Sequence, residues 1–508
     1  MTLQTNGLGR SGSDAVPTVA SARREEGAHK LLLGTFIHSQ SLGELRYRHG
    51  AAVAVSREGK IAAVEEDCDR SRAEAELLPR LGWALDDVVV VAAKDGQFFF
   101  PGFIDTHLHA SQYPNVGIFG KSTLLDWLHK YTFPMEASLA DPARARRVYG
   151  RCVRKTLSHG TTCAAYYATV DVASTNLLAD ICLAAGQRAL VGRVCMDSDL
   201  QPSWYRDEGW EAGLRATKEC IGHVERVDPG FATVRPVITP RFAPSCSAEM
   251  MKALGELHAE TGLPVQTHVS ENAAEIELVK ELFCGGFKRC DAAAEAEGKE
   301  DVLGSTYTGV YERYGLLTDK TILAHAVHLS EGEADLIAAR GAKVSHCPCS
   351  NSSITSGAAR VRWLLSRGVE VGLGTDMSGG YSPSVLEAAR QALLVSRHVA
   401  MTGGGDAAKL SVEEVLHLAT AGGARCVGLE GRVGAFEVGF DWDAQLVGLG
   451  GVGDDGEDEE GGEAEAGGNV DVFGWETWED RVAKWLFNGD DRNTKMVWVR
   501  GRLVHQRK

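Results

Sequence analysis

The chain has 508 residues, with 53 basic and 69 acidic side chains and a formal net charge of −16. Hydrophobic residues make up 44% of it and charged residues 24%, which is typical of a globular chain and excludes a mostly disordered one. The acidic balance argues against nucleic acid as a partner, because binding of a phosphate backbone needs a basic face. No apolar run is long enough to cross a bilayer, so we expect no membrane partner either.

The first residues, 1–28, are rich in Ser, Gly, Ala and charged side chains, and we predict a flexible tail there. This stretch lacks the apolar core of a secretory signal. Twelve cysteines are spread along the chain without the spacing of a disulfide framework. Together these features favour reduced thiols and a cytoplasmic protein.

Short alternating apolar segments follow the tail. They begin at Leu31, Ala51 and Ile61 and are separated by Gly-containing turns, which indicates a small β unit. The segment 495–499 (KMVWV) near the C-terminus has the same character. We expect these closing strands to return to the N-terminal β unit.

The sequence pattern is different in the middle of the chain, where short apolar runs alternate with longer stretches of helical periodicity. This alternation is typical of a parallel sheet with crossover helices. Eight such units favour a closed (β/α)₈ barrel, and an open doubly wound sheet is the alternative with the same periodicity. The predicted strands begin at Phe103, Thr161, Arg188, Phe231, Leu263, Thr321, Ala342 and Glu370.

Two stretches interrupt this pattern. Residues 285–304 form a predicted insertion between the fifth and sixth strands. Residues 448–468 contain eight acidic side chains and no basic one. We predict a solvated, disordered acidic loop there rather than a binding site for a basic partner.

Side chains that bind metals recur at the ends of the predicted strands. His107 and His109 are two residues apart, so they project from the same face of the first strand. His268 ends the fifth strand, His325 the sixth and Asp376 the eighth. Barrel enzymes place catalytic groups at these carboxyl ends. Imidazoles with one carboxylate suit Zn²⁺ with an open position for water, and Fe²⁺ accepts the same ligands.

Two further features lie near these strand ends. Glu271 follows His268 by three residues, and we expect it on the first turn of the next helix, leaning back over the strand end. A helix N-terminal carboxylate stabilised by the helix dipole is the alternative. Cys347 and Cys349 offer only two thiols, too few for a metal cage, and we expect them to be buried.

These motifs resemble those of the guanine deaminases, a group within the amidohydrolase superfamily of metal-dependent hydrolases. The resemblance runs from about Leu31 to Val504, and one difference is Cys349, where the related sequences lead us to expect Asn. The resemblance is carried by the segments 101–112 (PGFIDTHLHASQ), 128–134 (LHKYTFP), 239–242 (TPRF), 267–272 (THVSEN), 324–325 (AH), 346–348 (HCP) and 372–376 (GLGTD).

The resemblance implies a (β/α)₈ TIM-like barrel over residues 99–429. It also implies a small composite β-sandwich domain built from residues 29–98 and 430–508. One Zn²⁺ per subunit is implied, as are guanine as the substrate and a homodimer as the assembly. The implied metal ligands are His107, His109, His268 and Asp376; the implied catalytic residues are Glu271, His325 and Asp376; the implied substrate contacts are His109, Gln112, Arg241, Phe242, His268, Glu271 and Asp376.

The implied reaction is the hydrolytic deamination of guanine to xanthine and ammonia in purine metabolism. Zinc lowers the pKa of bound water from about 15.7 to about 7. Asp376 accepts a proton from that water, Glu271 carries protons to the ring and to the departing amine, and His325 stabilises the attacking oxygen. Arg241 and Gln112 can donate hydrogen bonds to the 6-oxo group, which adenine lacks, while Phe242 covers the flat ring.

Two alternatives remain at this point, and a third is excluded. A related amidohydrolase could act on another amino-heterocycle, and a catalytically inactive relative could serve as a scaffold. The cytidine-type zinc deaminases form a separate architecture with an H-x-E motif followed by P-C-x-x-C. His258 and Glu260 fit the first part, but Ser352 stands where the second thiol is required, so that match is accidental.

Overall fold

A computed structural model describes residues 27–122, 124–284, 306–452 and 469–507. Strands and helices alternate over most of this length, so the protein is of mixed α/β class. The predicted insertion 285–304 lies outside the described residues, and so does the predicted tail 1–28 except for its last two residues. None of the described helices is both long and apolar enough to cross a membrane.

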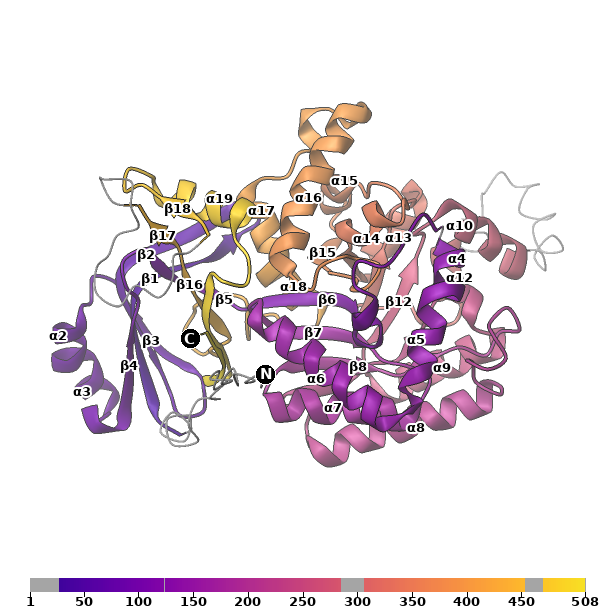
Figure 1. The fold of residues 1–508 in the computed structure, drawn as a ribbon, viewed down its shortest axis with the longest axis horizontal. Helices are drawn as coiled ribbons and strands as arrows, with labels where there is room; N and C mark the ends of the chain where they lie inside the picture. Colours follow the sequence, from indigo (N-terminus) through magenta and orange to yellow (C-terminus); the bar gives the residue numbers. More distant parts are fainter. Residues whose placement is uncertain (1–26, 123, 285–305, 453–468, 508) are drawn as a thin grey trace, which may run out of the picture.

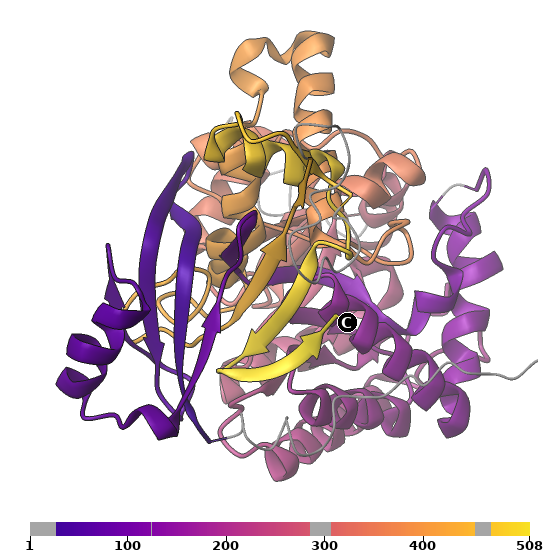
Figure 2. The same ribbon diagram turned by 60° about the vertical axis from the view of Figure 1, so that its left-hand side comes forward.

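Both ends of the chain contribute to one sheet of eight described strands (Figures 1 and 2). Its order is β20-β19-β16-β5-β1-β2-β3, and β4 pairs with β1. Strand β5 joins the two ends, because it pairs with β1 on one side and with β16 on the other. The strands are β1 (His29–Ser41), β2 (Glu44–Val55), β3 (Ile61–Glu65), β4 (Val88–Ala92), β5 (Gln97–Pro101), β16 (Ala444–Gly448), β19 (Thr494–Val499) and β20 (Arg502–Gln506).

Strands are present at all eight positions that the sequence predicts for the central region. They form two parallel four-stranded sheets, β10-β8-β7-β6 and β12-β13-β14-β15, and the parallel pair β9-β11. A parallel bridge between Ile238 and Val265 links the two sheets, and β15 contacts β6. The strands are β6 (Phe103–His109), β7 (Thr161–Tyr167), β8 (Arg188–Gly192), β9 (Val194–Cys195), β10 (Val234–Pro236), β11 (Thr239–Pro240), β12 (Val265–Val269), β13 (Thr321–His325), β14 (Lys343–His346) and β15 (Glu370–Leu373).

Helices connect successive parallel strands and lie around them (Figure 1). The main connecting helices are α6 (Pro142–Ser158), α7 (Val172–Ala185), α8 (Trp210–Val227), α9 (Ala248–Thr261), α10 (Ala273–Val279), α12 (Tyr307–Arg313), α13 (Glu331–Arg340), α14 (Pro348–Ser353), α15 (Val361–Ser366) and α16 (Val385–Val399). The other helices include α2 (Arg70–Arg72), α3 (Leu78–Leu81), α4 (Leu124–Trp127), α5 (Phe133–Ala137), α17 (Val412–His417), α18 (Gly423–Cys426) and α19 (Trp478–Asn488).

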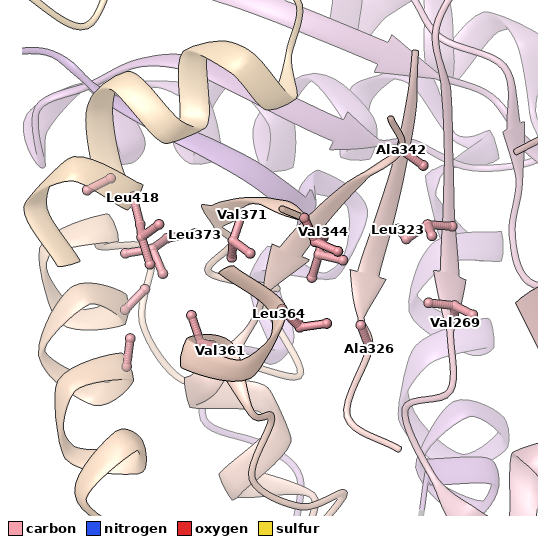
Figure 3. Close-up of a cluster of buried hydrophobic side chains, with 14 of the residues drawn as sticks. Val269, Leu323, Ala326, Ala342, Val344, Val361, Leu364, Val371, Leu373 and Leu418 are labelled. Atoms are coloured by element: carbon pink, nitrogen blue, oxygen red, sulfur yellow. The ribbon is translucent and has the colours of Figure 1, made fainter. Parts of the chain in front are cut away.

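A large apolar core lies between the second parallel sheet and its helices. Figure 3 shows Leu323, Val344 and Leu373 on adjacent strands, facing Val361 and Leu364 of α15. All of these side chains are buried. Burial of each such side chain contributes about 1.5–3 kcal/mol, so this cluster fixes the strands whose ends carry the predicted site residues.

The predicted acidic loop 448–468 begins with a short paired strand. Residues Gly450–Gly451 form β17, which pairs in parallel with β18 (Asp471–Val472). Residues 453–468 lie outside the described part of the chain.

Strand β5 buries aromatic rings on both faces, because successive side chains of a strand point to opposite sides. Phe99 stacks on Phe36 with ring centroids 4.8 Å apart. Phe98 and Phe100 point the other way and pack on Trp485 of α19, at centroid distances of 5.3 and 5.1 Å. Trp485 therefore holds the terminal sheet against the large core.

We expect Trp485→Ala to lower the free energy of unfolding by about 3–5 kcal/mol, since it leaves a cavity beside β5. Thermal or urea unfolding followed by tryptophan fluorescence and circular dichroism measures this change. Trp475→Ala is the matched control, because Trp475 is 77% exposed and its loss changes stability by no more than about 0.5 kcal/mol. Equal unfolding midpoints in the two variants would contradict the role given to Trp485.

Candidate active site

Five of the sequence-predicted residues meet at the carboxyl ends of the parallel strands. His107 and His109 lie in β6, His268 in β12 and His325 at the end of β13, while Asp376 follows β15. Asp376 Oδ1 lies 3.2 Å from His107 Nε2 and 3.4 Å from His109 Nε2. His109 Nε2 lies 3.2 Å from His268 Nε2. Four of the five residues are buried and His268 is partly exposed, so the group opens to a pocket through His268.

Backbone hydrogen bonds hold Asp376 beside β6. Its N–H donates to the carbonyl of His107 (2.8 Å), and the N–H of His109 donates to the carbonyl of Met377 (2.9 Å). The buried carboxylate of Asp105 accepts from the backbone N–H and the hydroxyl of Thr375, at 3.0 and 2.6 Å. The sequence analysis missed Asp105, although an acid inside the apolar run FIDTH is a signal for such a role.

The chain bends sharply at two of these residues. His325 has φ +74° and Asp376 has φ +44°, both in the left-handed region that non-glycine residues rarely adopt. Each such residue costs about 1–3 kcal/mol and persists only where its surroundings impose it. Backbone of this kind turns the two side chains inward over the strand ends.

Several imidazole nitrogens face the centre of the group without a proton or without a hydrogen-bond partner. His268 Nδ1 lies 2.5 Å from the carbonyl oxygen of Arg241, which can only accept, so Nδ1 carries the proton and Nε2 is free. His107 Nε2 and His325 Nε2 are buried and have no hydrogen-bond partner within the described ranges. Unpartnered nitrogens that converge in this way fit a cation at their centre.

The charges of the group also fit a divalent metal ion. Burial lowers the pKa of His107, His109 and His268, so these imidazoles are neutral and can act as ligands. Burial alone would raise the pKa of Asp376, but the neighbouring imidazoles hold it at about 2 and keep the carboxylate charged. The potential ligand atoms of His107, His109 and Asp376 lie within 4.8 Å of one another. Such a nitrogen and oxygen set suits a borderline metal such as Zn²⁺.

His325 and Glu271 face each other next to this group. His325 donates from Nδ1 to Asn351 Oδ1 (2.9 Å), and its Nε2 lies 3.5 Å from Glu271 Oε2 and 3.9 Å from Asp376 Oδ2. Ser356 Oγ donates to the other oxygen of Glu271 (3.0 Å). Burial raises the pKa of Glu271 to about 7, although the nearby His325 opposes this. Glu271 can therefore take up and release a proton near neutral pH.

Glu271 does not lie on the first turn of a helix, so the expected position is wrong. It lies in the link between β12 and α10, just before Asn272, whose side chain caps α10 by accepting from the N–H of Ala274 (2.9 Å). Ser270 has φ +48°, and this left-handed residue turns the chain at the end of β12. The turn brings Glu271 over the strand ends, and its backbone N–H donates to Glu275 Oε2 of α10 (3.0 Å).

A pocket opens beside the group, and all the predicted substrate contacts line it. Its walls are otherwise largely apolar, which suits a flat ring. The lining residues are His109, Gln112, Leu124, Trp127, Leu128, Arg241, Phe242, His268, Glu271, Glu275, His325, Ile354 and Asp376. Four lining residues were not predicted, because they come from segments without a metal or catalytic motif: Leu124, Trp127, Glu275 and Ile354.

Arg241 and Gln112 share a partner that the sequence analysis missed. Both side chains donate hydrogen bonds to Glu136 of α5, which is fully buried. The only signal in the sequence is its place two residues after Pro134, at the end of the motif 128–134.

Cys347 and Cys349 are both buried, as expected. Burial raises the pKa of both thiols, so they are protonated and poor metal ligands. Neither belongs to a group of close metal-type side chains in the described parts of the chain.

Residues 98–504 match the Amidohydrolase family. The chain is 45% identical over 474 residues to a probable guanine deaminase of Schizosaccharomyces pombe, covering 93% of this chain and 83% of that protein. It is 38% identical over 476 residues to the guanine deaminase of Homo sapiens, covering 93% and 95%. A crystal structure of guanine deaminase from C. acetobutylicum, with bound guanine in the active site, superposes with a TM-score of 0.78 at 30% identity, covering 94% and 100%.

Gly374 leaves no room for a side chain next to His107. A Cβ atom there would lie 2.6 Å from Ser345 Oγ and 2.9 Å from His107 Cβ. We expect Gly374→Ala to lower the free energy of unfolding by about 1–3 kcal/mol through overpacking. Thermal unfolding measures this.

Gly222→Ala in α8 is the matched control for this substitution, because the nearest atom to its added Cβ would be 3.6 Å away. A helical Gly→Ala change of this kind stabilises by about 0.5–1 kcal/mol. A Gly374→Ala protein as stable as the native one would show that the strand ends are not tightly packed here.

Proposed function

This chain belongs to the amidohydrolase family, and we propose that it is a guanine deaminase, converting guanine and water into xanthine and ammonia. The observation that carries the proposal is one pocket that combines purine-binding donors with a proton carrier. Arg241, Gln112 and Glu271 all line it, and Glu271 lies beside His325. The names of its relatives support the same reaction.

We also propose the finer architecture that the sequence resemblance implies. Residues 99–429 form a closed (β/α)₈ barrel, and residues 29–98 with 430–508 form a composite β-sandwich. Support for closure comes from the bridge between the two parallel sheets and from the hydrogen bonds that join Asp376 to β6. The eight-stranded sheet shared by both chain ends supports the second unit.

The proposed cofactor is one Zn²⁺ per subunit, held by His107, His109, His268 and Asp376. When bound, the ion lowers the pKa of a water molecule to about 7 and so supplies a nucleophile at neutral pH. The neutral imidazoles and the charged carboxylate described above support this ligand set.

Each polar side chain around the pocket has a proposed task. Asp376 takes a proton from the attacking water at Oδ2, the oxygen that faces His325. Glu271, with a pKa of about 7, gives a proton to the ring nitrogen next to C2, takes up the proton that the added hydroxyl loses, and passes it to the departing amine; the proton held by Asp376 then restores the acid form of Glu271. His325, held by Asn351, orients the attacking oxygen and stabilises its charge.

Polarity explains the proposed choice of guanine. Guanine has an oxo acceptor at position 6, where adenine has an amino donor. Arg241 and Gln112 have donors, and a guanidinium has no acceptor at all. Phe242, Leu128 and Trp127 provide apolar walls for the ring.

The proposed setting is cytoplasmic, within purine metabolism, and the proposed assembly is a homodimer. Ten of the twelve cysteines are free and buried, which supports a reducing compartment. The homodimer rests on the family resemblance.

The test is to incubate the purified, zinc-loaded protein with guanine and to follow the loss of guanine absorbance and the release of ammonia. Turnover of guanine, with adenine and amino-triazines turned over at least about 100-fold more slowly, is expected from the unpaired polar groups that a wrong base leaves. Preference for another amino-heterocycle would favour a different amidohydrolase activity. The absence of turnover on every compound would favour a scaffold.

Glu271→Gln removes the proposed proton carrier and keeps the shape of the side chain. We expect kcat to fall about 10²–10⁴-fold, because general acid–base help contributes that much, while the metal content stays at the native level. Glu333→Gln is the control: this buried carboxylate bonds Thr308 and Ser330 at the start of α13, outside the pocket. Native-like turnover in the Glu271→Gln protein would remove Glu271 from the mechanism.

His109→Ala removes one proposed metal ligand. We expect the zinc content, measured by atomic emission, to fall well below one ion per chain, and turnover to fall with it. His223→Gln is the control, since His223 pairs with Asp180 on the surface. Chelation of the native protein should lower both activity and unfolding temperature, because an ion that binds only the folded state stabilises it, and added Zn²⁺ should restore both. Full zinc occupancy in His109→Ala would argue against this ligand set.

A further inference from the structure

Glu136 lies at the centre of a buried hydrogen-bond network behind the pocket. Arg241 donates to its carboxylate from both terminal nitrogens, Nη1 to Oε2 at 2.7 Å and Nη2 to Oε1 at 3.1 Å. Gln112 Nε2 donates to Oε1 (2.8 Å), and the hydroxyl of Tyr205 donates to Oε2 (2.6 Å). Each oxygen thus accepts two hydrogen bonds, which fills the acceptor capacity of a carboxylate.

Only two of the four side chains in this network reach the pocket. Arg241 and Gln112 line the pocket, whereas Glu136 and Tyr205 do not. Glu136 takes one N–H of each Arg241 nitrogen and one N–H of the Gln112 amide, and each of these groups has a second N–H. Ser378 Oγ donates to Gln112 Oε1 (3.3 Å), which keeps the amide nitrogen turned toward Glu136. The second N–H of Arg241 Nη1 faces Met196 Sδ (3.8 Å), so the second N–H groups of Arg241 Nη2 and of the Gln112 amide are the ones left for a molecule in the pocket.

The network also balances charge. Burial alone would lower the pKa of Arg241, but the carboxylate of Glu136 more than offsets this and raises it, so the guanidinium stays charged. The side chain of Arg241 is 3% exposed and that of Glu136 is 0% exposed. An ion pair this far from water has no net charge, and removing one member leaves the other as an uncompensated buried charge.

We propose that Glu136 is a positioning residue that makes the pocket selective for an uncharged, oxo-bearing purine. It aims the free N–H groups of Arg241 and Gln112 at the oxo oxygen, and it cancels the charge that would otherwise attract a purine anion. This inference rests on the proposed deamination of guanine. The product, xanthine, loses a ring proton near neutral pH, and an Arg241–Glu136 pair without net charge adds no attraction that would retain the product anion.

Glu136→Gln tests the proposal with little change of shape. We expect KM for guanine to rise about 10–100-fold, as a disrupted buried hydrogen-bond set costs this much, with kcat within about 5-fold of native because Glu136 touches no reacting atom. The inhibition constant of xanthine separates this role from a purely structural one. In Glu136→Gln it should fall as pH rises through the ionisation of xanthine, whereas in the native protein it should stay constant or rise.

Glu136→Asp is the second variant, and it keeps the negative charge on a shorter side chain. We expect a raised KM, because the carboxylate no longer reaches all four donors, with a native pH dependence of xanthine inhibition. If Glu136→Gln fails to fold, this variant alone decides: an unchanged KM would overturn the positioning role. A xanthine affinity that increases with pH in Glu136→Asp would overturn the charge-balancing role.

Asp443→Asn is the matched control for the loss of a buried ion pair. Asp443 makes a two-pronged pair with Arg188, Oδ2 to Nε at 2.6 Å and Oδ1 to Nη2 at 3.1 Å, where β8 begins. We expect a lower unfolding temperature, with KM and the xanthine profile unchanged. Native KM and a native xanthine profile in a folded Glu136→Gln protein would overturn the proposal.

A failure of the proposed function can be told apart from a failure of the role of Glu136. If the proposed function is wrong, the native protein does not turn over guanine. In that case the positioning role is measured by calorimetric titration of guanine and xanthine into Glu271→Gln proteins with and without Glu136→Gln. Weaker guanine binding and tighter binding of the xanthine anion in the double variant support the role of Glu136. Equal affinities in the two proteins contradict it.

Discussion

The candidate site depends on the hydrogen bonds that join the end of β6 to the segment after β15. The N–H of Asp376 donates to His107, and the N–H of His109 donates to Met377. These bonds bring together two segments that lie more than 250 residues apart in the chain. Because residues two apart in a strand share a face, both imidazoles of β6 then point at the same oxygen of Asp376.

The site is locally unfavourable, and the packing around it holds it in place. Two buried imidazole nitrogens, His107 Nε2 and His325 Nε2, converge without hydrogen-bond partners in the described residues, and His325 and Asp376 have left-handed backbone. Local rules are broken in this way mostly at functional sites, where the rest of the fold compensates. Here the compensation comes from the apolar core under β12–β15 (Figure 3) and from the aromatic packing of β5 against Trp485.

Asp376, Glu271 and Glu136, three of the buried carboxylates around the pocket, have different environments and therefore different chemistry. Asp376, surrounded by imidazoles, has a pKa of about 2 and remains charged. Glu271, buried with a single serine hydroxyl as donor from a side chain, has a pKa of about 7 and can exchange a proton. Glu136 is paired with Arg241 and accepts four hydrogen bonds, which suits a fixed support. Environments that separate the behaviour of like groups are the usual means of assigning acid and base roles.

The sequence by itself determined which strands form and which side chains stand at their ends. Apolar runs of strand length predicted all eight parallel strands, and the i, i+2 spacing placed His107 and His109 on one face of a strand. Motif spacing identified the family, together with Arg241 and Gln112 as polar groups of the pocket. These features are local, because each is encoded within a few neighbouring residues.

Only the tertiary structure decided how these groups are held. The sequence contains no pattern that links Glu136 to Arg241, since they are 105 residues apart and meet only when α5 packs behind the pocket. Asn351, Ser356 and Asp105 were missed for the same reason, and Glu271 was misplaced because its position depends on a left-handed turn at Ser270. Periodicity reports the face of an element, whereas contacts between distant segments follow from how whole elements pack, and that packing alone sets the charge balance of the site.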